Sequence, residues 1–101
     1  MQQPSEETRD LREKVTAERA ALEDLLEKFT DRSTKDQVQR ALFDLDDVEV
    51  VLPMLEGETQ APLSQSLAKR TAALFFQSAV AKRVHFQHVL AEYGADVRLR
   101  P

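Results

Sequence analysis

Two histidines and a glutamate near the carboxyl-terminal end of the sequence are the residues whose types and spacing best suit metal chemistry. His85 and His88 are three residues apart, and Glu92 follows four residues later. On a helix these spacings bring all three side chains into one narrow sector, where imidazole and carboxylate groups are able to hold a divalent metal ion. Structural zinc sites mostly use four ligands, and the sequence has no HExxH motif. Metal binding is therefore an alternative, and an ordinary solvated surface is the stronger interpretation.

Other catalytic patterns are missing from the 101 residues. The chain has no cysteine, no glycine-rich phosphate loop, and no serine in the setting of a catalytic triad. Acid–base catalysis needs carboxylates held together in a cleft, with shifted pKa values. The densest acids are instead spread around one predicted helix: Asp44, Asp46, Asp47 and Glu49. We therefore predict that the protein is not an enzyme and requires no cofactor.

Charge is distributed unevenly along the chain, which has a formal net charge of −4. Residues 1–31 carry nine acids and five bases, residues 32–57 carry six and three, and residues 58–101 carry three and six. Opposite signs favour packing of the third segment against the first two. The bases of its helical part point in different directions and form no basic stripe: Lys69, Arg70, Lys82 and Arg83. A small nucleic-acid-associated regulator is thus a second, less favoured alternative.

Membrane and export signals are not found in the sequence. No stretch approaches the ~18 apolar residues that a membrane-spanning helix requires, and the first ten residues lack the layout of a secretory signal. The absence of cysteine suits a reducing compartment. We expect a soluble, cytoplasmic protein that does not bind membranes.

Caps and helix breakers divide the chain into three predicted helices, over residues 5–31, 34–56 and 62–93, with a tail over 95–101. Ser5 caps the first helix ahead of two glutamates, and Thr34 with Gln37 forms a capping box for the second. Gly57 and Gly94 follow the second and third helices, where glycine favours termination. A chain of this length supports one domain, over residues 1–101.

Apolar residues recur at three- and four-residue steps in all three segments, which predicts an all-α, antiparallel three-helix bundle with coiled-coil character and a long third helix. The widest apolar arc, from Leu67 to Tyr93, is expected to pack against both other helices. Pro53 is expected to kink or restart the second helix. Val50, Val51 and Met54 beside it are expected to be buried beneath the following turn, and a binding spot for an apolar partner is the alternative.

The third helix carries more apolar residues than the core of such a bundle needs. One group lies on its flank, and a second is expected to extend past the start of the second helix and overhang it. Together they are the predicted partner-binding residues: Phe76, Val80, Val84, Phe86, Val89, Leu90 and Tyr93. A large exposed apolar area of this kind marks an interface. The alternative is that the third helix is bent or shorter, or that the tail folds back so that Val97 and Leu99 shield these residues. The sequence therefore favours a non-catalytic interaction module, an assembly factor, adaptor or client-specific chaperone, which binds another protein or a second copy of itself.

Overall fold

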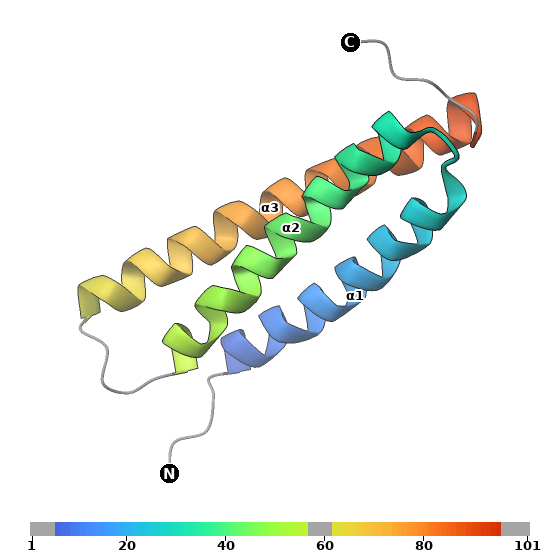
Figure 1. The fold of residues 1–101 in the computed structure, drawn as a ribbon. Helices are drawn as coiled ribbons and strands as arrows, with labels where there is room; N and C mark the ends of the chain where they lie inside the picture. The colour runs from blue at the N-terminus through green and yellow to red at the C-terminus, as the bar shows by residue number, and fades with distance from the viewer. Residues whose placement is uncertain (1–5, 57–61, 96–101) are drawn as a thin grey trace.

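Three long helices form an antiparallel bundle in the computed structural model, which describes residues 6–56 and 62–95 (Figure 1). They are α1 (Glu6–Lys28), α2 (Arg32–Glu56) and α3 (Pro62–Tyr93). The 32 residues of α3 span about 48 Å at 1.5 Å per residue, close to the 50 Å length of the molecule. The described residues are helical apart from short connecting segments, so the predicted all-α three-helix bundle is confirmed.

The side of α1 that faces the bundle is formed by residues at helical spacing, and its first half is poor in large apolar groups. Thr8, Val15, Leu22 and Leu25 are buried there. The helix ends at Lys28 and not at the predicted residue 31, and Asp24 and Lys28 form an ion pair of 2.8 Å. The Ser5 cap lies outside the described residues.

The start of α2 differs from the prediction, because Asp31 and not Thr34 caps the helix. The Asp31 carboxylate accepts hydrogen bonds from the Thr34 backbone N–H at 3.0 Å and from the Thr34 hydroxyl at 3.1 Å. Asp31 thus satisfies a backbone donor that has no partner within the first turn. The helix begins two residues early, at Arg32, and Thr34 is completely buried in its first turn.

The predicted restart of the helix at Pro53 does not occur, and a kink there stays a prediction. The helix runs unbroken to Glu56, so Pro53 lies in its last turn, where its missing N–H removes the hydrogen bond to the Glu49 carbonyl. Because the turns on both sides of Pro53 stay helical, Val50 and Met54 point outward, with 73% and 41% of their surface exposed. Only Val51 of the three apolar residues at this end is buried. The predicted burial of Val50 and Met54 is therefore wrong.

The core lies mainly around α2, which packs more extensively against α1 and α3 than those two helices pack against each other. Leucines and valines of α2 supply much of it, with Leu22 and Phe29 from the α1 side. The first two-thirds of α3 contribute small side chains, Ala68, Ala72 and Ala79. Leu67 and Leu74, which the sequence assigned to the packed arc, are 54% and 68% exposed. A helix of a three-helix bundle buries only one stripe, and here alanines occupy it.

Ion pairs join α3 to the other two helices, as the uneven charge distribution predicted. Arg83 donates to Glu18 of α1 at 2.5 Å, and Lys82 donates to Asp44 of α2 at 2.6 Å. Ser78 also donates to Asp44, at 2.8 Å. These partly buried contacts fix which faces of the helices meet.

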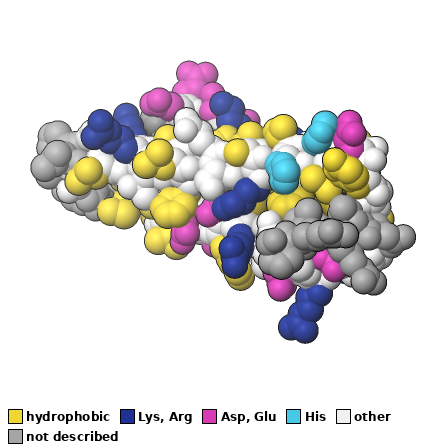
Figure 2. Space-filling model, turned by 90° about the horizontal axis from the view of Figure 1, so that it is seen from above, with side chains coloured by type: hydrophobic (Ala, Val, Ile, Leu, Met, Phe, Trp, Pro, Cys, Tyr) yellow, Lys and Arg dark blue, Asp and Glu magenta, His cyan; other side chains and the backbone are white. Residues whose placement is uncertain are grey.

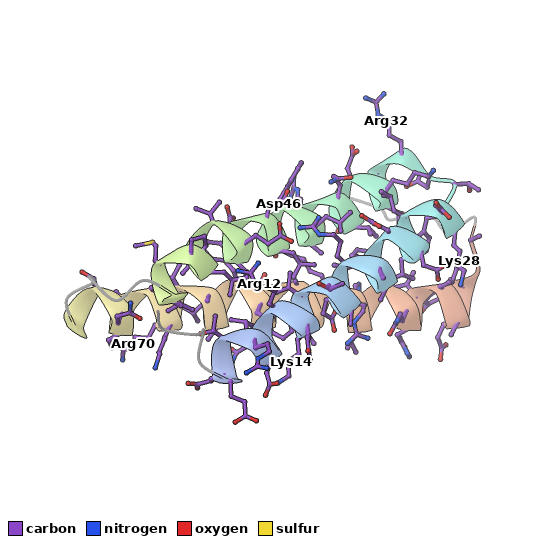
Figure 3. All side chains as sticks on the ribbon, turned by 90° about the horizontal axis from the view of Figure 1, so that it is seen from below. Arg12, Lys14, Lys28, Arg32, Asp46 and Arg70 are labelled. Carbon is purple, nitrogen blue, oxygen red and sulfur yellow. The ribbon has the colours of Figure 1, made fainter. Side chains whose placement is uncertain are left out.

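A further pair of contacts joins α1 to α2. Arg19 donates to Asp46 and Glu49 of α2 at 2.7 and 2.8 Å, and its hydrogen bond to Asp46 is the main reason that the pKa of Arg19 is raised. The Arg32 side chain projects away from the bundle (Figure 3), and Lys28 pairs with Asp24 of its own helix. The remaining surface charge is therefore available to solvent.

Gly94 ends α3 with φ at +83°, in the left-handed region. Its N–H donates to the Leu90 carbonyl at 3.0 Å, which closes the helix as an αL cap. Gly57 and the tail from residue 96 onward lie outside the described residues. Within the described ranges, no helix is long and apolar enough to cross a membrane.

Replacing Gly94 with alanine is expected to destabilise the protein by about 1–2 kcal/mol, the cost of placing an L side chain in the left-handed region. No atom lies within 4 Å of the new Cβ, so the loss is conformational and not steric. Thermal unfolding followed by circular dichroism measures it. Gly94→Asn serves as the control, because asparagine tolerates this conformation better and should lose less. Equal losses for the two variants would contradict this explanation.

Candidate functional site

The predicted overhang of α3 is wrong for two of its residues, because Phe86 and Val89 are only 2% and 5% exposed. Phe86 packs edge-on against Phe29, with ring centroids 6.0 Å apart. Just beyond Phe29, the Thr30 N–H donates to the Ala95 carbonyl at 3.2 Å and ties the α1–α2 connection to the end of α3. The prediction considered only α2 as the neighbour of α3, whereas Phe29, directly after the end of α1, covers this part of α3.

The other five predicted partner-binding residues do not lie on one surface. Tyr93 is 70% exposed at the last turn of α3, and Leu90 before it is half-buried against the core. Val84 is 53% exposed, while Val80 and Phe76 are half-buried one and two turns earlier. Of the seven, only Phe76 lines a groove that lies between α1 and α3.

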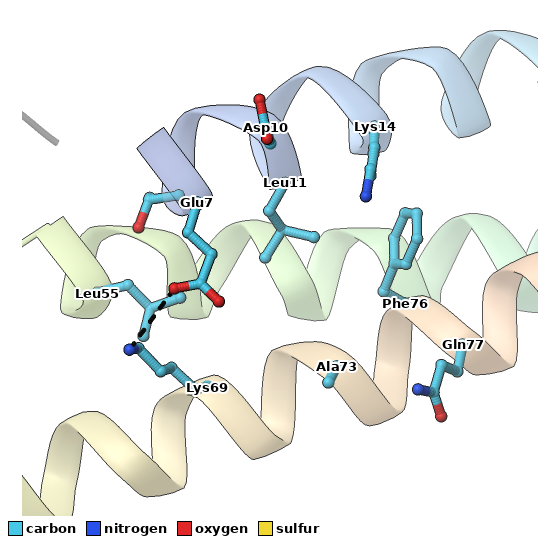
Figure 4. Close-up of a pocket in the computed structure, with 10 residues that line it drawn as sticks. Glu7, Asp10, Leu11, Lys14, Leu55, Lys69, Ala73, Phe76 and Gln77 are labelled. Atoms are coloured by element: carbon cyan, nitrogen blue, oxygen red, sulfur yellow. Dashed lines mark ion pairs between the residues drawn. The ribbon is translucent and has the colours of Figure 1, made fainter. Parts of the chain in front are cut away.

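A groove of about 290 Å³ lies between the first half of α1 and α3 (Figure 4). Most of its accessible lining is apolar, with Leu11 of α1 and Phe76 of α3 pointing into the space between the two helices. Leu55 closes it from α2, and Ala73 forms part of the α3 wall. Leu11, Leu55 and Phe76 are half-buried and continuous with the core.

Small side chains on both walls explain why the groove exists. On the α1 side that faces the bundle, the groups before the middle of the helix are Thr8, Leu11 and Val15, and none of them is aromatic. On α3, Ala73 presents a single methyl group where a leucine would fill the space. Toward the carboxyl-terminal end of α1, the Arg83–Glu18 ion pair and the Phe29–Phe86 contact bring this part of the chain and α3 together. The groove is therefore confined to the first half of α1.

Charged groups form the rim of the groove. Glu7 and Lys69 form an ion pair of 3.8 Å across it, with side chains 82% and 60% exposed (Figure 4). Such exposed pairs contribute only ~0–1 kcal/mol, so an incoming group can displace this one at little cost. Asp10 and Lys14 lie on the α1 side, and within the described part of the chain they do not form the i,i+4 ion pair that their spacing favours. Besides the Glu7–Lys69 pair, the rim thus offers a binding partner one acid, Asp10, and one base, Lys14.

The three candidate metal ligands are not brought together as a site. No group of three His, Asp or Glu side chains in residues 6–56 and 62–95 is arranged to hold a metal ion. His85 packs edge-on against Phe86, with ring centroids 5.0 Å apart, and His88 Nε2 is 3.9 Å from Glu92 Oε1. Both histidines lie on the surface (cyan, Figure 2). The metal-binding alternative gains no support from this geometry.

The nucleic-acid alternative gains no support either. Of the four bases in the described part of α3, three form ion pairs with acids of α1 and α2: Lys69, Lys82 and Arg83. Their charges are therefore partly neutralised within the bundle, and no basic stripe remains to follow a phosphate backbone.

Sequence reasoning identified Phe76 but missed the opposite wall of the groove. The signal that could have found it is the shortage of large apolar residues in the first half of α1 together with Ala73 in α3. No family model, no curated protein and no solved structure matches the chain.

Proposed function

We propose that the protein is a non-catalytic interaction module that binds an amphipathic helix of another protein in the groove between α1 and α3. The observation that carries this proposal is the groove itself, with an apolar floor continuous with the core and a charged rim. An assembly factor, adaptor or client-specific chaperone would use such a surface. The volume of the groove lies just below the ~300–1,000 Å³ that is usual for small-molecule pockets. Because its walls are two helices, the side chains of a partner helix fit it better than a small molecule does.

The dimensions of the groove support a helical occupant. Its α1 wall runs from Glu7 to Lys14 and its α3 wall from Lys69 to Gln77. At 1.5 Å per residue these stretches are about 10–12 Å long, or about two helical turns. A partner helix with apolar residues at i, i+3 or i+4, and i+7 would place them over Leu11, Leu55 and Phe76. It would become the fourth helix of the bundle.

Charge defines the rest of the partner. A basic residue beside the apolar anchors would pair with Asp10, and an acidic one would pair with Lys14. The net charge of −4 and the acidic α1 and α2 segments would accelerate association with a partner that is basic outside its anchors. The proposed ligand is thus an amphipathic helix with an acid next to its apolar face and a generally basic remainder.

A displayed library of helical peptides provides a defined probe for this proposal. The peptides, of about 18 residues, would vary at the apolar and flanking charged positions, and selection would use the wild-type protein. We expect enrichment of sequences with apolar residues at i, i+3 or i+4, and i+7. Ala73→Phe, which fills the groove, should raise the Kd of an enriched peptide at least ten-fold, or about 1.4 kcal/mol.

Ala91→Phe is the matched control. Ala73 and Ala91 are both exposed and lie 18 residues apart on α3, which is five turns and the same side of the helix. Ala91 does not line the groove. Ala91→Phe should leave the Kd unchanged. Failure to enrich any helical peptide, or equal binding to both variants, would refute the groove as the binding site.

A further inference from the structure

A second apolar surface lies on the face of the α2–α3 pair that is turned away from α1. Two leucines of α3 and two apolar residues near the end of α2 are exposed there: Leu67, Leu74, Val50 and Met54. Figure 2, seen from above, shows hydrophobic side chains exposed on both halves of the bundle, including the half away from the histidines. We name these four residues the α2–α3 patch. No residue of the patch lines the groove.

Hydrogen bonds between α2 and α3 place the two halves of the patch at the same end of the bundle. Gln65 donates to the Met54 carbonyl at 2.7 Å, which sets the end of α2 beside the start of α3. Further along the antiparallel pair, Lys82 and Ser78 meet Asp44. Between these two contacts, the outward residues of α2 and α3 lie at similar levels. The exposed residues of the patch on α2 and α3 therefore lie at similar levels along the bundle.

The charges beside the patch have opposite signs on its two helices. Asp47 of α2 lies between Val50 and the Asp44 contact, and Arg70 of α3 lies between Leu67 and Leu74. Both side chains are exposed, and neither forms an ion pair within the described part of the chain. If two copies meet so that α2 of each faces α3 of the other, the acid on α2 meets the base on α3. Such a surface is therefore complementary to itself.

We infer that this patch is where two copies of the chain associate, with the two-fold axis parallel to the helices. That symmetry places α2 of one copy against α3 of the other at the same level. Leu67 and Leu74 then face Val50 and Met54 of the second copy, and Arg70 approaches Asp47. A two-fold axis perpendicular to the helices would instead place acid near acid and base near base, so charge favours the parallel axis.

The area available is sufficient for such a dimer. A stable interface buries ~800 Å² on each partner, about one-ninth of the accessible surface of 7045 Å². One side of a three-helix bundle 50 Å long provides that area. Covering the patch also removes four exposed apolar side chains from water, which is the main driving force for association.

Light scattering after size-exclusion chromatography, over a concentration series, tests the inference. The wild-type protein should approach twice its chain mass of 11.5 kDa. Leu67→Asp should remain a monomer at every concentration. Val84→Asp is the matched control, because Val84 is 53% exposed and Leu67 is 54% exposed on the same helix but on different sides. A monomeric wild type, or equal dissociation of the two variants, would overturn the inference.

Charge reversal distinguishes the proposed symmetry from other modes of self-association. Asp47→Arg and Arg70→Asp should each weaken their own dimer, because like charges then meet at both symmetry-related positions. Mixed in equal amounts, the two variants should form a heterodimer, in which both positions pair opposite charges. If the mixture associates no better than either variant alone, the parallel two-fold arrangement is wrong. Because the patch is separate from the groove, a negative result here leaves the peptide-binding test unaffected.

Discussion

Truncation of Phe29 to alanine is expected to lower the free energy of unfolding by about 3–5 kcal/mol. Phe29 is completely buried and its ring packs edge-on against Phe86, so the change removes the aromatic contact and leaves a cavity between α1 and α3. The whole domain is held by about 5–15 kcal/mol, so this loss takes a large share of its stability. Urea denaturation at one fixed protein concentration, followed by circular dichroism, measures the difference.

Phe43→Ala is the control for this prediction. Phe43 is 56% exposed on α2, so its truncation removes the same atoms without forming a cavity. Its effect should stay within about 0.5 kcal/mol. Similar losses for the two variants would show that Phe29 does not hold the end of α1 against α3.

Replacing Asp31 with alanine is expected to cost about 1.5–5 kcal/mol, an average effect second to that of Phe29→Ala. Loss of the helix cap accounts for about 0.5–2 kcal/mol. The remainder comes from Thr34, whose completely buried hydroxyl loses its acceptor, at a cost of about 1–3 kcal/mol. Chemical denaturation of Asp31→Ala against the wild type measures the sum.

A double variant separates the two contributions. Thr34→Val removes the hydroxyl, so Asp31→Ala/Thr34→Val buries no unsatisfied donor. The double variant should therefore be less destabilised than the sum of the two single variants. Strict additivity would mean that the buried hydroxyl does not depend on Asp31, contrary to the contact described.

The sequence predicted the architecture because each helix has a regular apolar spacing and recognisable punctuation. Gly94 ends α3 as expected, since only glycine takes up φ of +83° without strain. The boundaries between α1 and α2 were less predictable. Asp31 and Thr34 are both good capping residues, and only the buried position of Thr34 decides between them.

The surface of α3 was harder to predict, because periodicity identifies an apolar arc but not which part of it the other helices cover. Leu67 and Leu74 were expected in the core, yet Ala68 and Ala72 occupy it and allow the helices to approach closely. Phe86 was expected to be exposed, yet Phe29, directly after the end of α1, covers it. Burial at these positions depends on three helices at once, which pairwise alignment of two helices does not capture.

The groove could be predicted only in part, because it arises from what is small on each wall. Phe76 was identified as surplus apolar surface, and the weak packing of the first half of α1 was visible in its composition. Their juxtaposition was not, because it depends on how α1 and α3 are oriented around α2. The three candidate metal ligands show the opposite case, in which favourable spacing on one helix does not produce a site.

Backbone amide chemical shifts, measured with and without the selected helical peptide, test the central claim most directly. If the peptide occupies the groove, its binding should shift the amides of residues 7–14 in α1 and 69–77 in α3, with Leu55 at their centre. Shifts concentrated instead at Val50, Met54 and Leu74, with residues 7–14 unchanged, would place the bound helix on the α2–α3 patch. That result would contradict the groove as the binding site.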